Sequence, residues 1–135
     1  MWGQLMIQKH PEIKLEENIQ KINSFKELEH GWDTYDADPI PLTVIENAIE
    51  IVKQLKIQPK VFPTAADSIF FEYDEICLNE AGEVIGDQGL IFEIKEDKIG
   101  ICWMRDVNDF DDYSVELTDI NHLNNILDKF GFEET

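Results

Sequence analysis

Carboxylates are the side chains in this 135-residue chain that can do chemistry, and they gather in its second half. Between residues 67 and 100 they fall on or between strand-like runs: Glu72, Asp74, Glu75, Glu80, Glu83, Asp87, Glu93, Glu96 and Asp97. Because alternate residues of a strand point to the same face of a sheet, some of them must share one outer face. Such a face can bind a basic protein surface, and rows of carboxylates can imitate the phosphates of DNA. We therefore predict partner contacts at Glu72, Asp74, Glu75 and Glu93.

A second acidic segment, residues 106–112, invites a calcium interpretation, because oxygen ligands at alternate positions suit that ion. Three details depart from a calcium loop: Phe110 occupies the fifth position, no glycine follows it, and Leu117 stands at the twelfth. We interpret the segment as a solvated acidic loop within a negative surface. Its predicted partner-binding residues are Asp106, Asp109, Phe110, Asp111 and Asp112.

The connector at residues 29–41 joins two helix-like segments and carries two large aromatic side chains, Trp32 and Tyr35. These aromatics can form an exposed anchor for a partner. Alternatively, Trp32 fills the core while Tyr35 fixes the connector through its hydroxyl, and we favour this second interpretation. Asp33 is expected to accept hydrogen bonds from nearby backbone amides. Trp32 and Tyr35 are kept as the second candidate for partner contact.

Support for catalysis is weak. The histidines, His10, His30 and His122, are isolated and lack the spacing of a metal motif or of a nucleophile's base. The sequence contains neither a Gly-x-Ser-x-Gly elbow nor a phosphate-binding glycine loop. Cys77 and Cys102 lie in separate apolar runs and are expected to be buried free thiols, since a disulfide would need neighbouring strands. We predict a non-enzyme that uses no cofactor and no metal.

The net charge indicates the kind of partner. The chain carries −18 overall; residues 1–66 hold 10 acidic and 7 basic residues, and residues 67–135 hold 19 and 4. A field of this sign repels nucleic acid and anionic membranes and attracts basic protein surfaces, although acidity can equally serve solubility alone. We identify no secretory signal and no apolar run of membrane length. The expectation is a cytoplasmic protein whose partner is a protein with a basic surface, with no direct nucleic-acid or membrane binding.

Apolar periodicity predicts the elements that position these residues. One helix is predicted from about residue 12 to 29 with Gly31 as its stop, or else two short helices broken near Asn23. A second helix follows a capping box at Thr43 and ends before residue 59. A last helix begins at Thr118 or Asp119 and ends at Gly131. Strands are predicted at 61–64, 69–73, 76–78, 84–85, 90–94, 99–104 and 113–117, with turns at 74–75 and 86–89.

This order of elements is typical of an α+β fold. We predict a single domain, 1–135, with two N-terminal helices, an antiparallel sheet of about five to six strands, and a C-terminal helix. Its expected parts are an N-terminal arm (1–11), a helical part (12–57), the sheet (60–117) and the final helix (118–131).

The connector resembles a pattern, GWDxYxAxPI, of a widespread group of small uncharacterised bacterial and phage proteins. In this chain the pattern runs from Gly31 to Ile40, and the group's later parts, PxVxPT and an acidic-aromatic strand, correspond to residues 59–64, 69–73 and 90–94. Asp36 stands where the group tends to have glycine, and residues 76–88 look inserted. The resemblance brings no established activity; it implies a setting of mobile elements and phage–host conflict.

Together these observations favour a small acidic, non-enzymatic binding protein. We expect a phage or mobile-element inhibitor of a host defence protein that binds a basic surface of its target, with nucleic-acid mimicry as one mode. The first alternative is an antitoxin or immunity-type protein that neutralises a cognate toxin. The second is an enzyme or metal-binding domain, which would need a pocket with convergent polar groups.

Overall fold

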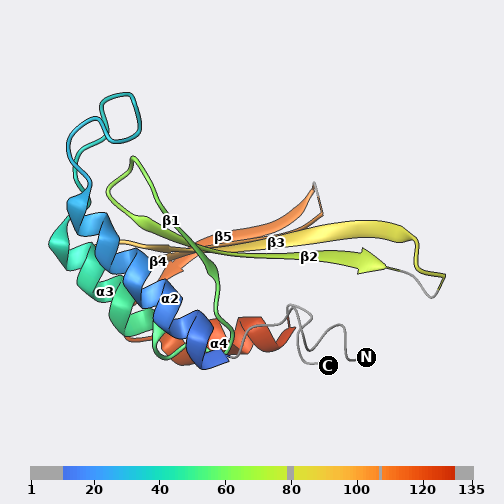
Figure 1. Cartoon of the computed structure of the whole chain (residues 1–135). Coiled ribbons are helices and arrows are strands. Elements are labelled where there is room, and N and C mark those ends of the chain that lie inside the picture. Colours follow the sequence, from blue (N-terminus) through green and yellow to red (C-terminus); the bar gives the residue numbers. More distant parts are fainter. Residues whose placement is uncertain (1–10, 79–80, 107, 130–135) are drawn as a thin grey trace.

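The computed structural model describes residues 11–78, 81–106 and 108–129, and its element labels are those of Figure 1. The helices are α2 (Pro11–Ser24), a 3₁₀ turn η1 (Phe25–Glu27), α3 (Leu42–Val52) and α4 (Ile120–Leu127). The strands are β1 (Lys60–Pro63), β2 (Ile69–Leu78), β3 (Val84–Ile94), β4 (Ile99–Asp106) and β5 (Asp109–Val115). The predicted α+β class is confirmed. Most of the predicted N-terminal arm and the predicted helix end at Gly131 lie outside the described residues.

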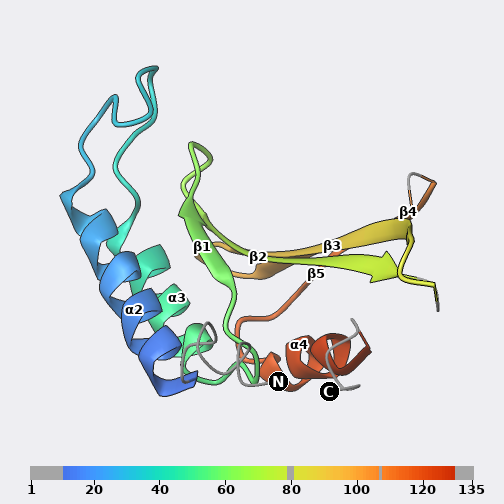
Figure 2. The same ribbon diagram turned by 45° about the vertical axis from the view of Figure 1, so that its right-hand side comes forward.

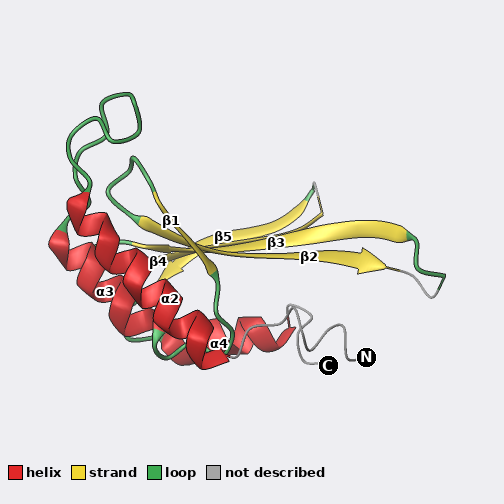
Figure 3. Ribbon diagram, viewed as in Figure 1, coloured by secondary structure: helices red, strands yellow, loops and turns green. Residues whose placement is uncertain are grey.

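The strands form one antiparallel sheet in the order β1-β2-β3-β4-β5, so each strand pairs with its neighbour in the sequence. The described α-helices all lie on one side of this sheet, and the opposite side carries no helix among the described residues (Figures 1 and 2). Figure 3 shows the two layers by colour, with the red helices below the yellow sheet. The fold therefore has an inner sheet face toward the helices and an outer face toward solvent.

Alternation of apolar residues along the strands builds the core. Alternate residues of β1 to β4 turn to the inner face, and those that are buried there are Val61, Ile69, Phe71, Tyr73, Leu90, Phe92, Ile94, Ile99 and Ile101. The apolar stripes of α3 and α4 cover this face with Val44, Ile45, Ala48, Ile51, Val52, Ile120, Leu123, Ile126 and Leu127. Removing these apolar side chains from water, at ~25 cal/mol per Å² of buried apolar surface, holds the helices on the sheet.

Polar side chains join the helices to the loops of the sheet. Asn47 of α3 donates through Nδ2 to the carbonyls of Lys95 and Glu96, at 3.0 and 3.1 Å, in the predicted β3–β4 hairpin loop. Thr43 donates its hydroxyl to Glu96 Oε2 at 2.9 Å. Asn124 of α4 accepts from the backbone amide of Lys56 at 2.9 Å. The contacts of Asn47 and Asn124 satisfy loop backbone groups that no regular element would pair.

The predicted breaks in the middle strands are wrong. Asp74 pairs with Gly89 and Glu75 with Gln88 inside a continuous β2–β3 ladder, so residues 74–75 and 86–89 are strand and not turn. Acidic residues and glycine have low strand propensity, but that propensity is set largely by neighbouring strands. The resulting long hairpin extends well beyond the helices (Figure 1).

Three predicted helix-end signals act differently in the structure. The first helix ends at Ser24 and tightens into η1, whereas Gly31, at φ +84°, lies in the connector and donates its N–H to the carbonyl of Ala37 at 2.8 Å. Thr43 does not cap α3, because its hydroxyl is used on the hairpin loop. Asp119 precedes α4 as predicted but makes no side-chain cap bond.

Candidate functional site

The outer face of the sheet gathers several of the predicted partner-binding residues. Register places these residues on it, strand by strand: Lys60 and Phe62; Phe70, Glu72 and Asp74; Gly89, Ile91 and Glu93; Gly100, Cys102 and Met104; Phe110, Asp112 and Ser114. Strand periodicity alone turns all of them away from the buried set. The structure thus brings together Glu72, Asp74, Glu93, Phe110 and Asp112, which come from three different strands.

An apolar strip crosses this outer face from β1 to β5. It consists of three cross-strand pairs, Phe62 with Phe70, Ile91 with Cys102, and Met104 with Phe110. Phe62, Met104 and Phe110 are 38%, 47% and 53% exposed, and the other three are partly exposed. The solvated face of an antiparallel sheet is normally polar. An exposed apolar strip on such a face marks a place where another surface can bind.

Carboxylates border the strip, and basic side chains lie close to only some of them. Asp74 lies 4.0 Å from Lys60 Nζ, and Glu93 lies 3.8 Å from Lys95 Nζ. Among the described residues no lysine, arginine or histidine comes within 4.0 Å of Glu72 or Asp112. The face therefore offers two carboxylates that are available to a cationic partner.

A hollow of about 260 Å³ interrupts the strip beside Gly100. It is lined by Phe70, Ile91, Glu93, Gly100, Ile101, Cys102 and Asp112. Ser68, fully buried, donates its hydroxyl to Glu93 Oε2 at 2.7 Å, and the Thr64 hydroxyl lies 2.7 Å from that of Ser68. Burial, and secondarily the charge of Asp112, raises the pKa of the Cys102 thiol, which therefore stays neutral near pH 7.

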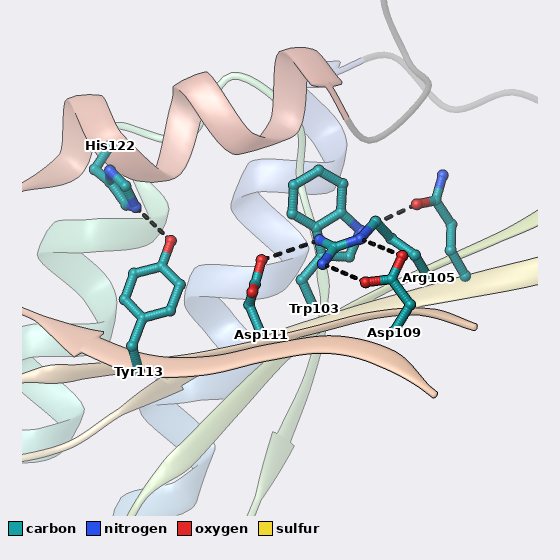
Figure 4. Close-up of polar contacts among 7 residues, drawn as sticks. Trp103, Arg105, Asp109, Asp111, Tyr113 and His122 are labelled. Carbon is teal, nitrogen blue, oxygen red and sulfur yellow. Dashed lines mark hydrogen bonds and ion pairs between the residues drawn. The ribbon is translucent and has the colours of Figure 1, made fainter. Parts of the chain in front are cut away.

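Two of the predicted acidic contacts, Asp109 and Asp111, are engaged within the molecule. Arg105 Nη2 lies 3.0 Å from Asp109 Oδ1, and Nη1 lies 3.1 Å from Asp111 Oδ2 (Figure 4). The guanidinium stacks on Trp103 at 4.8 Å, and its hydrogen bonds hold the pKa of Asp109 below the usual range. Residues 109–111 are therefore part of strand β5, pinned to β4, and not a free loop as predicted. The sequence patterns do not single out Arg105, although it is the chain's only arginine and is surrounded by acids.

Tyr113 and His122 join the last strand to the last helix. The Tyr113 hydroxyl lies 2.6 Å from His122 Nε2, and the rings meet edge to face at 5.6 Å (Figure 4). Burial, then Asp111 and Asp119, raises the pKa of Tyr113. His122 thus has a structural partner, which its isolated place in the sequence does not reveal.

The connector is a second, separate candidate, and it projects from the ends of α2 and α3 (Figures 1 and 2). Asp33 Oδ1 accepts from the amides of Tyr35 and Ala37 at 2.9 and 3.2 Å, as predicted. Trp32 packs at the edge of the core and donates Nε1 to the Asp38 carbonyl at 2.9 Å. Tyr35 is 81% exposed, so the prediction that its hydroxyl fixes the connector is wrong.

Some predicted residues are placed differently or lie outside the described part of the structure. Cys102 is a free thiol but is partly exposed and not buried. The side chains of Cys77, Glu75 and Asp106 lie outside the described part. Within the described ranges, no group of three or more His, Cys, Asp or Glu side chains is placed to hold a metal ion. None of the described helices has the length and apolar character needed to cross a membrane.

Comparisons with protein-family models, with curated proteins and with solved structures found no match to this chain. The outer face and the connector are therefore the features from which a function can be inferred.

Proposed function

We propose that the chain is a non-enzymatic binding protein whose outer sheet face binds a basic, partly apolar surface of another protein. The observation that carries this proposal is the exposed strip of three apolar pairs, bordered by carboxylates, on a sheet face that the described helices leave open except at Phe62, where Lys21 Nζ of α2 lies 4.8 Å from the ring centre. Protein interfaces combine an apolar centre with a polar rim in this way.

The outer face suits an amphipathic protein surface better than it suits a groove made for nucleic acid. Glu72 and Asp112 stand in one row of the sheet, but Ile91 and Cys102 lie between them. The carboxylates of this row therefore do not follow one another as the phosphates of a DNA strand do. A second copy of this chain is a poor occupant, because two molecules of charge −18 repel each other.

A non-enzymatic role agrees with how the candidate nucleophile and bases are used. The Ser68 hydroxyl is committed to Glu93, and the ring nitrogens of His30 and His122 face Asp38 and Tyr113, at 3.0 and 2.6 Å. Each of these polar groups serves a local structural contact. The resemblance of the connector to small bacterial and phage proteins adds a setting, and we propose an inhibitor that occupies the basic surface of a host defence protein.

The experiment is affinity capture from a lysate of the native host with two charge-matched variants. Glu72→Lys with Asp112→Lys alters the outer face, whereas Glu16→Lys with Glu46→Lys makes the same change of net charge on exposed helix positions. We expect one protein with a basic surface to be captured by the wild type and by the helix variant, and to be lost with the outer-face variant and in ~0.5 M NaCl, because screening weakens such contacts. Equal capture by both variants would refute the proposal.

A second candidate function, toxin neutralisation through the connector, is favoured by one observation. Tyr35 is a large aromatic side chain, 81% exposed, on a loop held in shape by Asp33. Exposed rigid aromatics are common energetic centres of interfaces. If this candidate is right, a toxin gene lies next to the gene for this chain, and Tyr35→Ser abolishes neutralisation while the thermal unfolding temperature stays unchanged.

A further inference from the structure

We propose that the hollow beside Gly100 receives a lysine or arginine side chain of the bound protein. This inference rests on the proposed function and deepens it, because it names the partner's anchoring residue. General attraction by charge requires only the carboxylates of the outer face, whereas the insertion of one specific side chain requires the hollow as well.

The hollow exists because position 100 has no side chain. Gly100 pairs with Glu93 on β3 and with Ser114 on β5, in the middle of the outer face. A Cβ built there would lie 3.5 Å from Glu93 Cβ and 3.6 Å from Glu93 Oε1, which is ordinary contact. No backbone strain demands glycine at this position, and a strand normally favours a larger residue. The hollow that Gly100 helps to line has a volume of about 260 Å³, far more than the ~10–15 Å³ that one water needs.

The chemistry of the lining matches a long cationic side chain. Phe70 and Ile91 offer apolar surface for the methylene stem, which long basic side chains bury readily while the charged end stays polar. Glu93 on β3 and Asp112 on β5 flank β4, so they can receive the charged end from two sides. An apolar side chain would desolvate Asp112, which has no described cation within 4.0 Å, and would supply no charge in return, which is costly.

Glu93 is held ready for such a contact. Its Oε2 accepts the hydrogen bond from buried Ser68, so little side-chain entropy remains to be lost when a partner binds. Lys95 Nζ lies 3.8 Å from Glu93 Oε1 and already neutralises part of the charge of Glu93. Asp112, which has no described cation within 4.0 Å, is therefore expected to contribute more to binding than Glu93.

The test begins with ¹⁵N–¹H NMR titrations of the full chain with three small probes. N-acetyl-lysine methylamide and N-acetyl-arginine methylamide are the cationic probes, and N-acetyl-norleucine methylamide is the uncharged control of similar length. We expect saturable shifts of the amides at 91, 100, 102 and 112 with at least one cationic probe and none with norleucine. Asp112→Asn should weaken the binding of that probe about two- to five-fold, the range of one exposed ion pair. Shifts spread evenly over all acidic regions would overturn the inference.

The affinity capture is then repeated with two variants, one that fills the hollow and one that removes a charge from its lining. Gly100→Val adds branches into the hollow and retains strand propensity, and Asp112→Asn changes no volume, so one of the two serves even if the other fails to fold. We expect both variants to bind the captured protein more weakly, Asp112→Asn by about two- to five-fold. If charge reversal at Glu72 and Asp112 abolishes capture while Gly100→Val leaves it intact, the hollow is not the anchor, although the outer face still binds.

Discussion

Replacing Tyr73 by phenylalanine should produce a loss of stability that disappears at high pH. The Tyr73 side chain is 4% exposed; its ring meets Phe92 edge to face, and its hydroxyl donates to the carbonyl of Ile57 at 2.6 Å. That bond ties β2 to the segment between α3 and β1. Because phenylalanine keeps the ring and removes only the hydroxyl, the Tyr73→Phe change should cost ~1 kcal/mol of unfolding free energy at pH 7, the net worth of one hydrogen bond.

The pH dependence follows from the burial of the same hydroxyl. Burial raises the pKa of Tyr73 well above its ordinary value. In the unfolded chain the phenol ionises near pH 10, whereas in the folded protein it keeps its proton. The contribution of Tyr73 is thus complete below pH 10 and falls by ~1.4 kcal/mol per pH unit above it. By about pH 11 the wild type has lost about as much as the hydrogen bond contributes, so the two proteins should then be about equally stable.

Urea unfolding at pH 7, 9, 10 and 11, followed by circular dichroism, measures this difference. Tyr35→Phe is the matched control, because its hydroxyl lies on a side chain that is 81% exposed and should change stability at no pH. A difference between wild type and Tyr73→Phe that stays constant from pH 7 to 11 would refute the reasoning. An equal pH response in the control would refute it as well.

Three further outcomes are expected. Asp33→Ala removes the acceptor of two connector amides and should cost ~1 kcal/mol in urea unfolding, with faster hydrogen exchange confined to the connector. Arg105→Met should raise the pKa of Asp109 toward its ordinary value, which a carboxyl NMR titration measures. In the wild type the lowered pKa means that ionised Asp109 stabilises the fold above the pKa of the unfolded chain, and that this stabilisation is lost as the pH falls. The substitution should remove this contribution. Phe71→Ala should cost ~3–5 kcal/mol by thermal or urea unfolding, whereas Phe110→Ala on the outer face should stay within ~0.5 kcal/mol.

Period-two patterns make the two faces of the sheet predictable from the sequence. Ile69, Phe71 and Tyr73 alternate with Phe70 and with the acids Glu72 and Asp74, and the two acids show which side of the strand cannot be buried. That alternation places Glu72 on the opposite side, and the same logic applies to Glu93 between two buried neighbours. Strand periodicity alone is therefore enough to predict that these acids share the outer face.

The apolar strip is not predictable in this way, because it depends on register between strands. Ile91 and Cys102 become neighbours only when β3 and β4 pair, and Met104 meets Phe110 across a hairpin with an irregular register near its end. The pairing of Arg105 with two aspartates depends on the same hairpin. Local propensity also fails where a long-range ladder overrides it, as it does at Asp74.

The two edges of the sheet are built to oppose the addition of a further strand, although the outer face exposes apolar side chains. At one edge β1 has only four residues and ends in Pro63, which lacks the N–H that a further strand would need. At the other edge β5 carries Asp109, Asp111 and Asp112, whose charges repel the β5 edge of a second molecule. Short, proline-ended or charged edges are the usual protection against strand addition and amyloid-like growth. Both edges thus oppose strand addition by a second molecule, and concentrated samples of the isolated chain should resist fibre formation.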